Sequence, residues 1–204
     1  GKYSPAYGIV PPTPGYEAVL PEWAGMAGEA RHARARELYA AAGFSALRPL
    51  EVELWYPMSD TDTRRLMEGI AAMWRDRLGA RVRIESEEWR AFQQDRKLRQ
   101  HGLFYYARTG DFPDPFTFLS LPMTGGEQNE MLYASRQFDA AVEQGRRSVD
   151  PAARQSAYQR AERILNADAV VVPLYYYRSK HLVRAHVQGW RESLMDRHAS
   201  RDLS

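Results

Sequence analysis

Cysteine is absent from this sequence, and so is any long hydrophobic run. The lack of cysteine excludes thiol catalysis, disulfide bonds and thiolate metal sites. A membrane-spanning helix needs roughly 20 consecutive apolar residues, and no stretch of the chain approaches this length. The first residues lack both an initial Met and the apolar core of a signal peptide, as we expect of a fragment or a processed product.

Lysine is scarce as well, with three residues against 25 arginines. Basic and acidic residues nearly balance at 28 and 26, so the net charge is only +2. The two signs are interspersed along the chain and form no continuous basic patch, which disfavours a nucleic-acid partner. With 204 residues, 44% of them apolar, the chain can bury a core as one large domain or two small ones.

Five histidines are present, but they share no spacing typical of a metal site. They are His32, His101, His181, His186 and His198. We therefore expect no metal ligands and no cofactor. Asp111 and Asp114 form a close carboxylate pair that suits acid/base chemistry. Because no nucleophile or metal shell accompanies this pair, we expect a binding protein, with no catalytic residues, and keep a hydrolase as a minor alternative.

The apolar pattern predicts an α/β fold. Residues 50–55 and 81–85 alternate as half-buried strands do, and a helical stripe over 66–78 with Met73 and Trp74 in the core separates them. This order favours parallel strands with a right-handed crossover. Further helices are predicted over 29–42, 89–99, 136–146 and 151–166, with a helical turn at 116–119 and strands over 103–108 and 170–177.

The loop 107–115, with the sequence ARTGDFPDP, is the most informative segment. Two prolines at alternate positions fix their own φ angles and bias the preceding residues toward extended conformations, so the loop is expected to be stiff. Arg108 and Asp111 lie at opposite ends of one short turn. A stiff loop with both charges suits a zwitterionic ligand, although an ordinary turn with solvated charges explains the segment equally well.

Aromatic residues are numerous and predict the walls of a ligand site. In the strand-like run that ends at residue 177, alternation directs Tyr175 and Tyr177 to one face and Tyr176 to the other. Trp89 begins a short polar helix, where its packing is hard to predict. Large aromatic walls with a few fixed charges suit a promiscuous site for a peptide or another amphipathic ligand.

The order of these features resembles the extracytoplasmic solute-binding proteins of peptide ABC transporters, the dipeptide/oligopeptide-binding family. The matching phrases are PAYG (5–8), AAGF (41–44), EW (88–89), ARTGDFPDP (107–115), VPLYYY (172–177) and VQGW (187–190). The resemblance covers essentially the whole chain. It implies a periplasmic-binding-protein-like α/β lobe, with a mixed sheet flanked by helices and extended terminal segments that cross between lobes.

Members of that family are at least twice as long and have two lobes that close on a peptide. The resemblance therefore implies that residues 1–27 form an extended arm between lobes and that residues 28–184 form the C-terminal lobe. Residues 185–204 form a return segment toward an N-terminal lobe. The implied partners are short peptides, that first lobe and the membrane permease of the importer. The implied location is periplasmic or extracytoplasmic, with membrane anchoring through a preceding segment left open.

The resemblance also implies a set of ligand-binding residues. Asp111 matches the carboxylate that binds the peptide ammonium, and Arg108 matches an arginine that binds the peptide carboxylate in some members. The relatives place a Trp-containing tripeptide before the Asp, so a gapless alignment puts Arg108 at the Trp instead. Trp89 and Tyr177 match aromatic residues that face the ligand. The full expected set also includes Tyr175, Gly110 and Phe112.

Two alternatives stay open at this point. The same lobe could be a ligand-sensing module of a regulatory protein, in which binding is read without transport. The importer could also carry a solute other than a peptide, for which Asp111 favours an amine-bearing compound.

Overall fold

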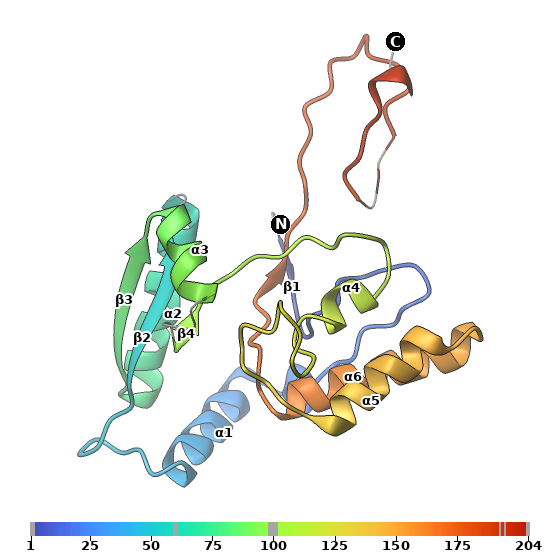
Figure 1. The fold of residues 1–204 in the computed structure, drawn as a ribbon. Helices are drawn as coiled ribbons and strands as arrows, with labels where there is room; N and C mark the ends of the chain where they lie inside the picture. The colour runs from blue at the N-terminus through green and yellow to red at the C-terminus, as the bar shows by residue number, and fades with distance from the viewer. Residues whose placement is uncertain (1–2, 59–60, 98–101, 192, 194, 203–204) are drawn as a thin grey trace. The chain divides into compact units, whose positions relative to one another are not determined.

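A computed structural model describes residues 3–58, 61–97, 102–191, 193 and 195–202. Contacts between Cα atoms divide the chain into two compact units (Figure 1). One unit is Gly25–Arg108, and the other joins Gly1–Ala24 to Thr109–Ser204. The predicted α/β class is confirmed. The predicted arm, lobe and return segment concern the whole two-lobed protein and stay a prediction.

The unit Gly25–Arg108 is built on a parallel three-stranded sheet in the order β3–β2–β4. Its strands are β2 (Glu51–Pro57), β3 (Arg81–Glu87) and β4 (Leu103–Phe104). Its helices are α1 (Gly28–Ala41), α2 (Thr61–Leu78) and α3 (Trp89–Lys97). Helix α2 connects β2 to β3, so the parallel pairing of these strands confirms the predicted strand–helix–strand unit. The last residues predicted for the third helix, 98–99, lie outside the described residues.

Different helices cover the two faces of this sheet. Leu54 of β2 packs in one core cluster with Met67 of α2. Phe104 of β4 lies opposite Trp55, the next residue of β2, and therefore points to the other face. On that face, the ring of Phe92 from α3 lies 6.4 Å from the ring of Phe104. The sheet is thus enclosed by α2 on one side and α3 on the other.

The predicted core face of α2 needs a correction. The helix buries the row Thr63, Met67 and Ala71, whereas Met73 is exposed and Trp74 is only half-buried. Residues four apart lie on one line along a helix, and it is this line that faces the sheet. Leu66 and Ile70 of the predicted stripe do pack against this core, so the prediction was wrong at Met73 and Trp74.

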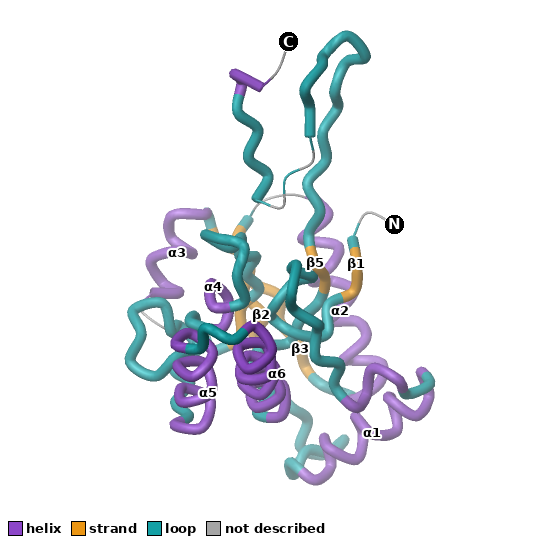
Figure 2. Tube along the Cα trace, turned by 90° about the vertical axis from the view of Figure 1, so that its right-hand side faces the viewer, coloured by secondary structure: helices purple, strands orange, loops and turns teal. Residues whose placement is uncertain are grey.

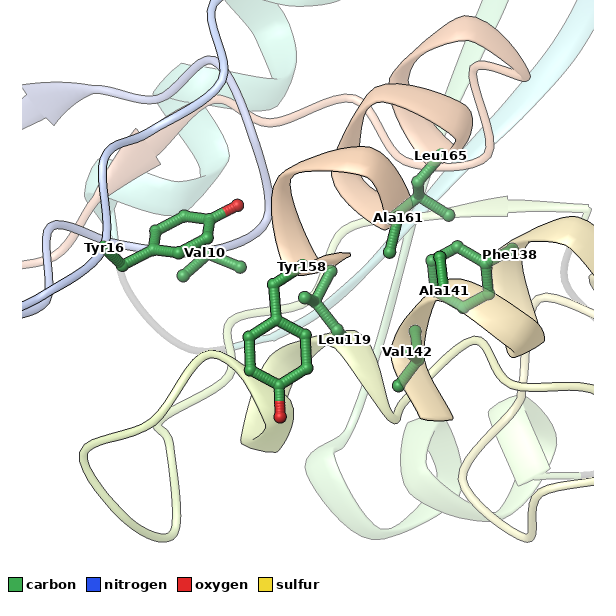
Figure 3. Close-up of a cluster of buried hydrophobic side chains, with 9 residues drawn as sticks. All are labelled: Val10, Tyr16, Leu119, Phe138, Ala141, Val142, Tyr158, Ala161 and Leu165. Carbon is green, nitrogen blue, oxygen red and sulfur yellow. The ribbon is translucent and has the colours of Figure 1, made fainter. Parts of the chain in front are cut away.

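The second unit packs the N-terminal segment against three helices: α4 (Phe116–Leu119), α5 (Arg136–Arg147) and α6 (Pro151–Ala167). Helix α6 begins as predicted, with the Asp150 side chain accepting a hydrogen bond from the Ala153 N–H at 2.8 Å. Figure 3 shows the core in which the N-terminal segment meets the helices. Its members are Val10, Tyr16, Leu119, Phe138, Ala141, Val142, Tyr158, Ala161 and Leu165.

Two predicted strands are shorter than expected. Strand β5 is only Tyr175–Tyr176 and pairs antiparallel with β1 (Ser4–Pro5), whose proline offers no N–H to a longer ladder. Strand β4 ends at Phe104 because the ladder with β2 closes with one further bond, from Tyr105 N–H to the Trp55 carbonyl at 2.7 Å. Beyond β5, an irregular segment extends outward and turns back on itself (Figure 2).

One buried carboxylate fastens the N-terminal segment to α6. Glu162 has no exposed surface, and it accepts hydrogen bonds from Val10 N–H at 3.0 Å, Tyr16 O–H at 2.5 Å and Val19 N–H at 3.4 Å. Burial raises the pKa of the Glu162 carboxyl despite these donors. A Cβ at Gly8 would collide with the same carboxylate, so only glycine fits there. The sequence feature that could have predicted this buried carboxylate is the position of Glu162, one turn after Tyr158 on the apolar face of α6.

Replacing Glu162 with Ala should lower the free energy of unfolding by about 2–4 kcal/mol, because it leaves buried N–H and O–H donors without an acceptor. Glu17→Ala is the matched control, since Glu17 is an exposed carboxylate on the same segment. We expect the control to change stability by less than about 0.5 kcal/mol. Urea denaturation followed by circular dichroism measures both values, and equal values would contradict this role of Glu162.

Candidate functional site

Hydrogen bonds at Asp111 and Asp114 hold the loop 109–115, which directly follows the boundary between the two units. The Asp111 N–H donates to Thr117 Oγ1 at 2.9 Å, which ties the start of the loop to α4. Asp114 accepts a hydrogen bond from Phe116 N–H at 2.8 Å and another from Arg154 Nη2 at 2.6 Å. These bonds fix the loop to α4 and α6, in line with the stiffness that its prolines predict.

Gly110 is required by close packing rather than by its φ angle. A Cβ at this position would lie 2.9 Å from the Phe118 ring and from the Thr117 side chain, closer than real Cβ contacts allow. The glycine therefore lets the backbone approach α4 directly before Asp111. The position of Asp111 thus depends on the glycine before it and on the threonine hydroxyl that binds its N–H.

The two aspartates have different environments. Asp111 is exposed, whereas Asp114 is half-buried and engaged by Arg154. Their side chains are not a matched acid/base pair, because one of them serves as the N-terminal anchor of α4 and the partner of an arginine. This geometry disfavours the hydrolase alternative.

Three aromatic rings meet at the strand pair β1–β5. The Tyr3 ring lies 4.5 Å from the Tyr175 ring and 5.9 Å from the Tyr177 ring. The hydroxyl of Tyr176 donates in the opposite direction, to the carbonyls of Gly8 and Val10. The predicted alternation of the three tyrosines is therefore confirmed, and Tyr177 keeps 67% of its surface exposed.

The expected ligand-binding residues are divided between the two units. Asp111, Gly110, Phe112, Tyr175 and Tyr177 belong to the unit that contains the helices α4–α6. Phe112 is 43% exposed, and its ring stacks on that of Phe116 at 6.4 Å. Their role in binding stays a prediction.

Trp89 and Arg108 belong to the sheet-containing unit, Gly25–Arg108. Trp89 is 48% exposed at the start of α3, and Arg108 is exposed at the end of the unit. An open hollow of about 390 Å³ lies along α3 and is lined by Arg90, Gln93, Gln94 and Lys97. None of the expected ligand-binding residues lines this hollow.

The structure also brings together side chains that the sequence did not connect. His181, Asp196 and His198 converge in the irregular segment after β5. The spacing of the histidines did not indicate this meeting, because the segment folds back and brings residues that are far apart in the sequence into contact. The expectation of no metal ligands stays a prediction. Within the described part of the chain, no helix has the length and apolar character needed to cross a membrane.

A family model for bacterial extracellular solute-binding proteins, family 5, matches residues 1–130. The periplasmic oligopeptide-binding protein OppA of Escherichia coli is 34% identical over 190 residues, which cover 91% of this chain and 34% of OppA. A probable deoxycholate-binding periplasmic protein of Escherichia coli, YgiS, is 28% identical over 93% of this chain and 36% of its own length. The chain thus spans about a third of the length of these curated relatives.

The solved structure of OppA from Burkholderia pseudomallei superposes with a TM-score of 0.88 and 26% identity. The match covers 98% of this chain and 40% of that protein. This likeness confirms the expected fold class, a periplasmic-binding-protein-like arrangement of sheets flanked by helices.

Removal of the Asp114 charge by Asp114→Asn should lower the free energy of unfolding by about 1–2 kcal/mol, because it replaces a charge-assisted bond to Arg154 with a neutral one. Glu127→Gln serves as the control, since this exposed carboxylate lies in the same unit. Urea unfolding measures both variants. An Asp114→Asn protein as stable as the control would show that the pair with Arg154 does not hold the loop.

Proposed function

Because the chain belongs to the family 5 bacterial extracellular solute-binding proteins, we propose that it is the C-terminal lobe of the substrate-binding component of an ABC importer for short peptides. The family consists of solute-binding proteins, and we assign no catalytic step to this chain. Binding would occur as two lobes close on the peptide by a hinge motion. The relative described as an oligopeptide-binding protein supports the peptide as ligand.

The observation that carries the proposal is the environment of Asp111. Its backbone is fixed by Thr117 and by the close approach of Gly110 to α4, while the residue itself lies at an exposed position. An exposed carboxylate on a fixed backbone suits the ammonium group of a peptide, since charge-assisted bonds are stronger than neutral ones. Asp111 would thereby fix the register of the bound peptide.

The other expected residues would supply the remaining contacts. Trp89, Tyr175 and Tyr177 would line side-chain pockets, because exposed aromatic faces accept varied apolar groups. Arg108 would bind the peptide carboxylate, since a guanidinium binds carboxylates in a bidentate manner. Gly110 and Phe112 would shape the loop around Asp111. Hydrogen bonds to the peptide backbone and bridging waters would make the site tolerant of sequence.

The partners in this proposal are an N-terminal lobe of the same protein and the permease subunits of the importer. The location would be periplasmic, as the names of the relatives indicate for those proteins. A transported solute other than a peptide is the second candidate, because a relative is described as a probable deoxycholate-binding protein. A secretion signal in the gene upstream of residue 1 would favour the importer, and a helix-turn-helix there would favour a sensory protein.

The substitution Asp111→Asn tests the proposal in a two-lobed protein that carries this sequence. It should weaken the binding of tripeptides with a free N-terminus by at least about tenfold, which corresponds to about 1.4 kcal/mol. Binding of the same peptides after N-acetylation should change by less than about threefold, because the acetylated end carries no charge for Asp111 to bind.

Isothermal titration calorimetry measures these affinities, and Glu127→Gln controls for a general change of surface charge. Equal losses for free and acetylated peptides would remove Asp111 from the ammonium site. Failure of the unmodified protein to bind any tripeptide would count against the peptide as ligand.

A further inference from the structure

Among its described residues, the irregular segment after β5 has no buried apolar side chain. It extends beyond Tyr177 and folds back (Figures 1 and 2). Folding back brings the arm that carries His181 near the arm that carries Asp196 and His198. Leu182 on the outgoing arm is fully exposed, and Tyr177 at its base is 67% exposed. The contacts that join the arms are therefore polar and aromatic, and they centre on two histidines and one aspartate.

The three side chains converge on a single oxygen atom. His181 Nε2 lies 2.6 Å from Asp196 Oδ1, and His198 Nε2 lies 3.1 Å from the same atom. The two imidazole rings lie 4.9 Å apart in an edge-to-face arrangement. One ligand atom from each residue falls within 4.8 Å of the others. Two imidazole nitrogens and one carboxylate oxygen are a donor set that suits zinc, nickel or copper.

The surroundings of the three residues orient them. The Trp190 ring stacks on His198 at 3.8 Å and lies 4.8 Å from the His181 ring, so it forms an aromatic wall on the cluster. Ser179 forms a hydrogen bond with the Asp196 carboxylate from outside the cluster. Metal ligands in proteins are commonly held by such outer contacts.

The backbone at Asp196 is shaped for the cluster as well. Its φ angle of 52° lies in the left-handed region, which aspartate tolerates better than most residues. The turn that creates this angle is closed by the bond from Asp196 N–H to the Ser193 carbonyl at 3.0 Å, and the Arg197 N–H donates to Ser193 Oγ.

We propose that His181, Asp196 and His198 bind one divalent transition-metal ion that clamps the two arms of the segment together. His181 lies 15 residues before Asp196, so the ion closes a loop that apolar packing does not hold. Solvent would complete the coordination. The ion is a resident of the segment and not the solute proposed for the peptide site, which uses other residues.

Calorimetric titration of the 204-residue chain, prepared without a histidine tag and stripped with chelator, tests the site with Zn²⁺. One equivalent should bind with a Kd in the micromolar range or below. His181→Gln and His198→Gln should each weaken binding at least tenfold, because each removes one of three ligands. His186→Gln is the matched control, since this exposed histidine lies in the same segment outside the cluster, and it should leave the affinity unchanged.

Ni²⁺ provides a second readout that depends on Trp190. An open-shell ion held by His198 lies beside the stacked indole and should quench its fluorescence in a saturable manner. Trp190→Phe should abolish most of this quenching and still bind one Zn²⁺ per chain. Far-UV circular dichroism verifies that the variants are folded.

Three results would overturn the proposal. They are the lack of saturable binding at one equivalent, equal weakening by His186→Gln and His198→Gln, and quenching that Trp190→Phe does not reduce. A peptide-binding defect caused by Asp111→Asn leaves this test unaffected, because the two sites share no residue.

Discussion

The buried carboxylate of Glu162 is the interaction on which the helical unit depends. A carboxyl group without any exposed surface is costly, and it is tolerated here because backbone N–H groups of the N-terminal segment and the Tyr16 hydroxyl converge on it. The segment has little regular structure of its own beyond the two residues of β1. Its path is therefore determined by α6, and through the Gly8 and Val10 carbonyls it also positions Tyr176 of β5.

This fastening connects the fold to the candidate site. Because the hydroxyl of Tyr176 is held on one face of β5, its neighbours Tyr175 and Tyr177 must point to the other face, toward Tyr3. The aromatic side of the proposed site is thus a consequence of a buried polar network. On the loop, Arg154 of the same helix binds Asp114. Helix α6 therefore supports both the tyrosines and the loop that carries Asp111.

Local patterns predicted most of the elements, and tertiary contacts explain where they failed. The start of α6 was predictable because Asp150 and Pro151 form a cap with a known geometry. The lengths of β4 and β5 were not predictable, since they depend on how much of a partner strand is available for pairing. The rotation of α2, which buries Met67 instead of Met73, depends on the sheet it covers. The contact between His181 and His198 depends on a turn at Asp196, which the spacing of the residues does not predict.

In the proposed function, one loop separates support, at Asp114, from recognition, at Asp111. A carboxylate that already pairs with an arginine gains little from a second cation, because its charge is compensated. Asp114, bound to Arg154 and to the first N–H of α4, is in this position. Asp111 lies three residues earlier, exposed, with its main chain fixed through Thr117. In the proposed function, a ligand ammonium would find there a carboxylate whose main chain is already held in place, which lowers the cost of ordering the site on binding.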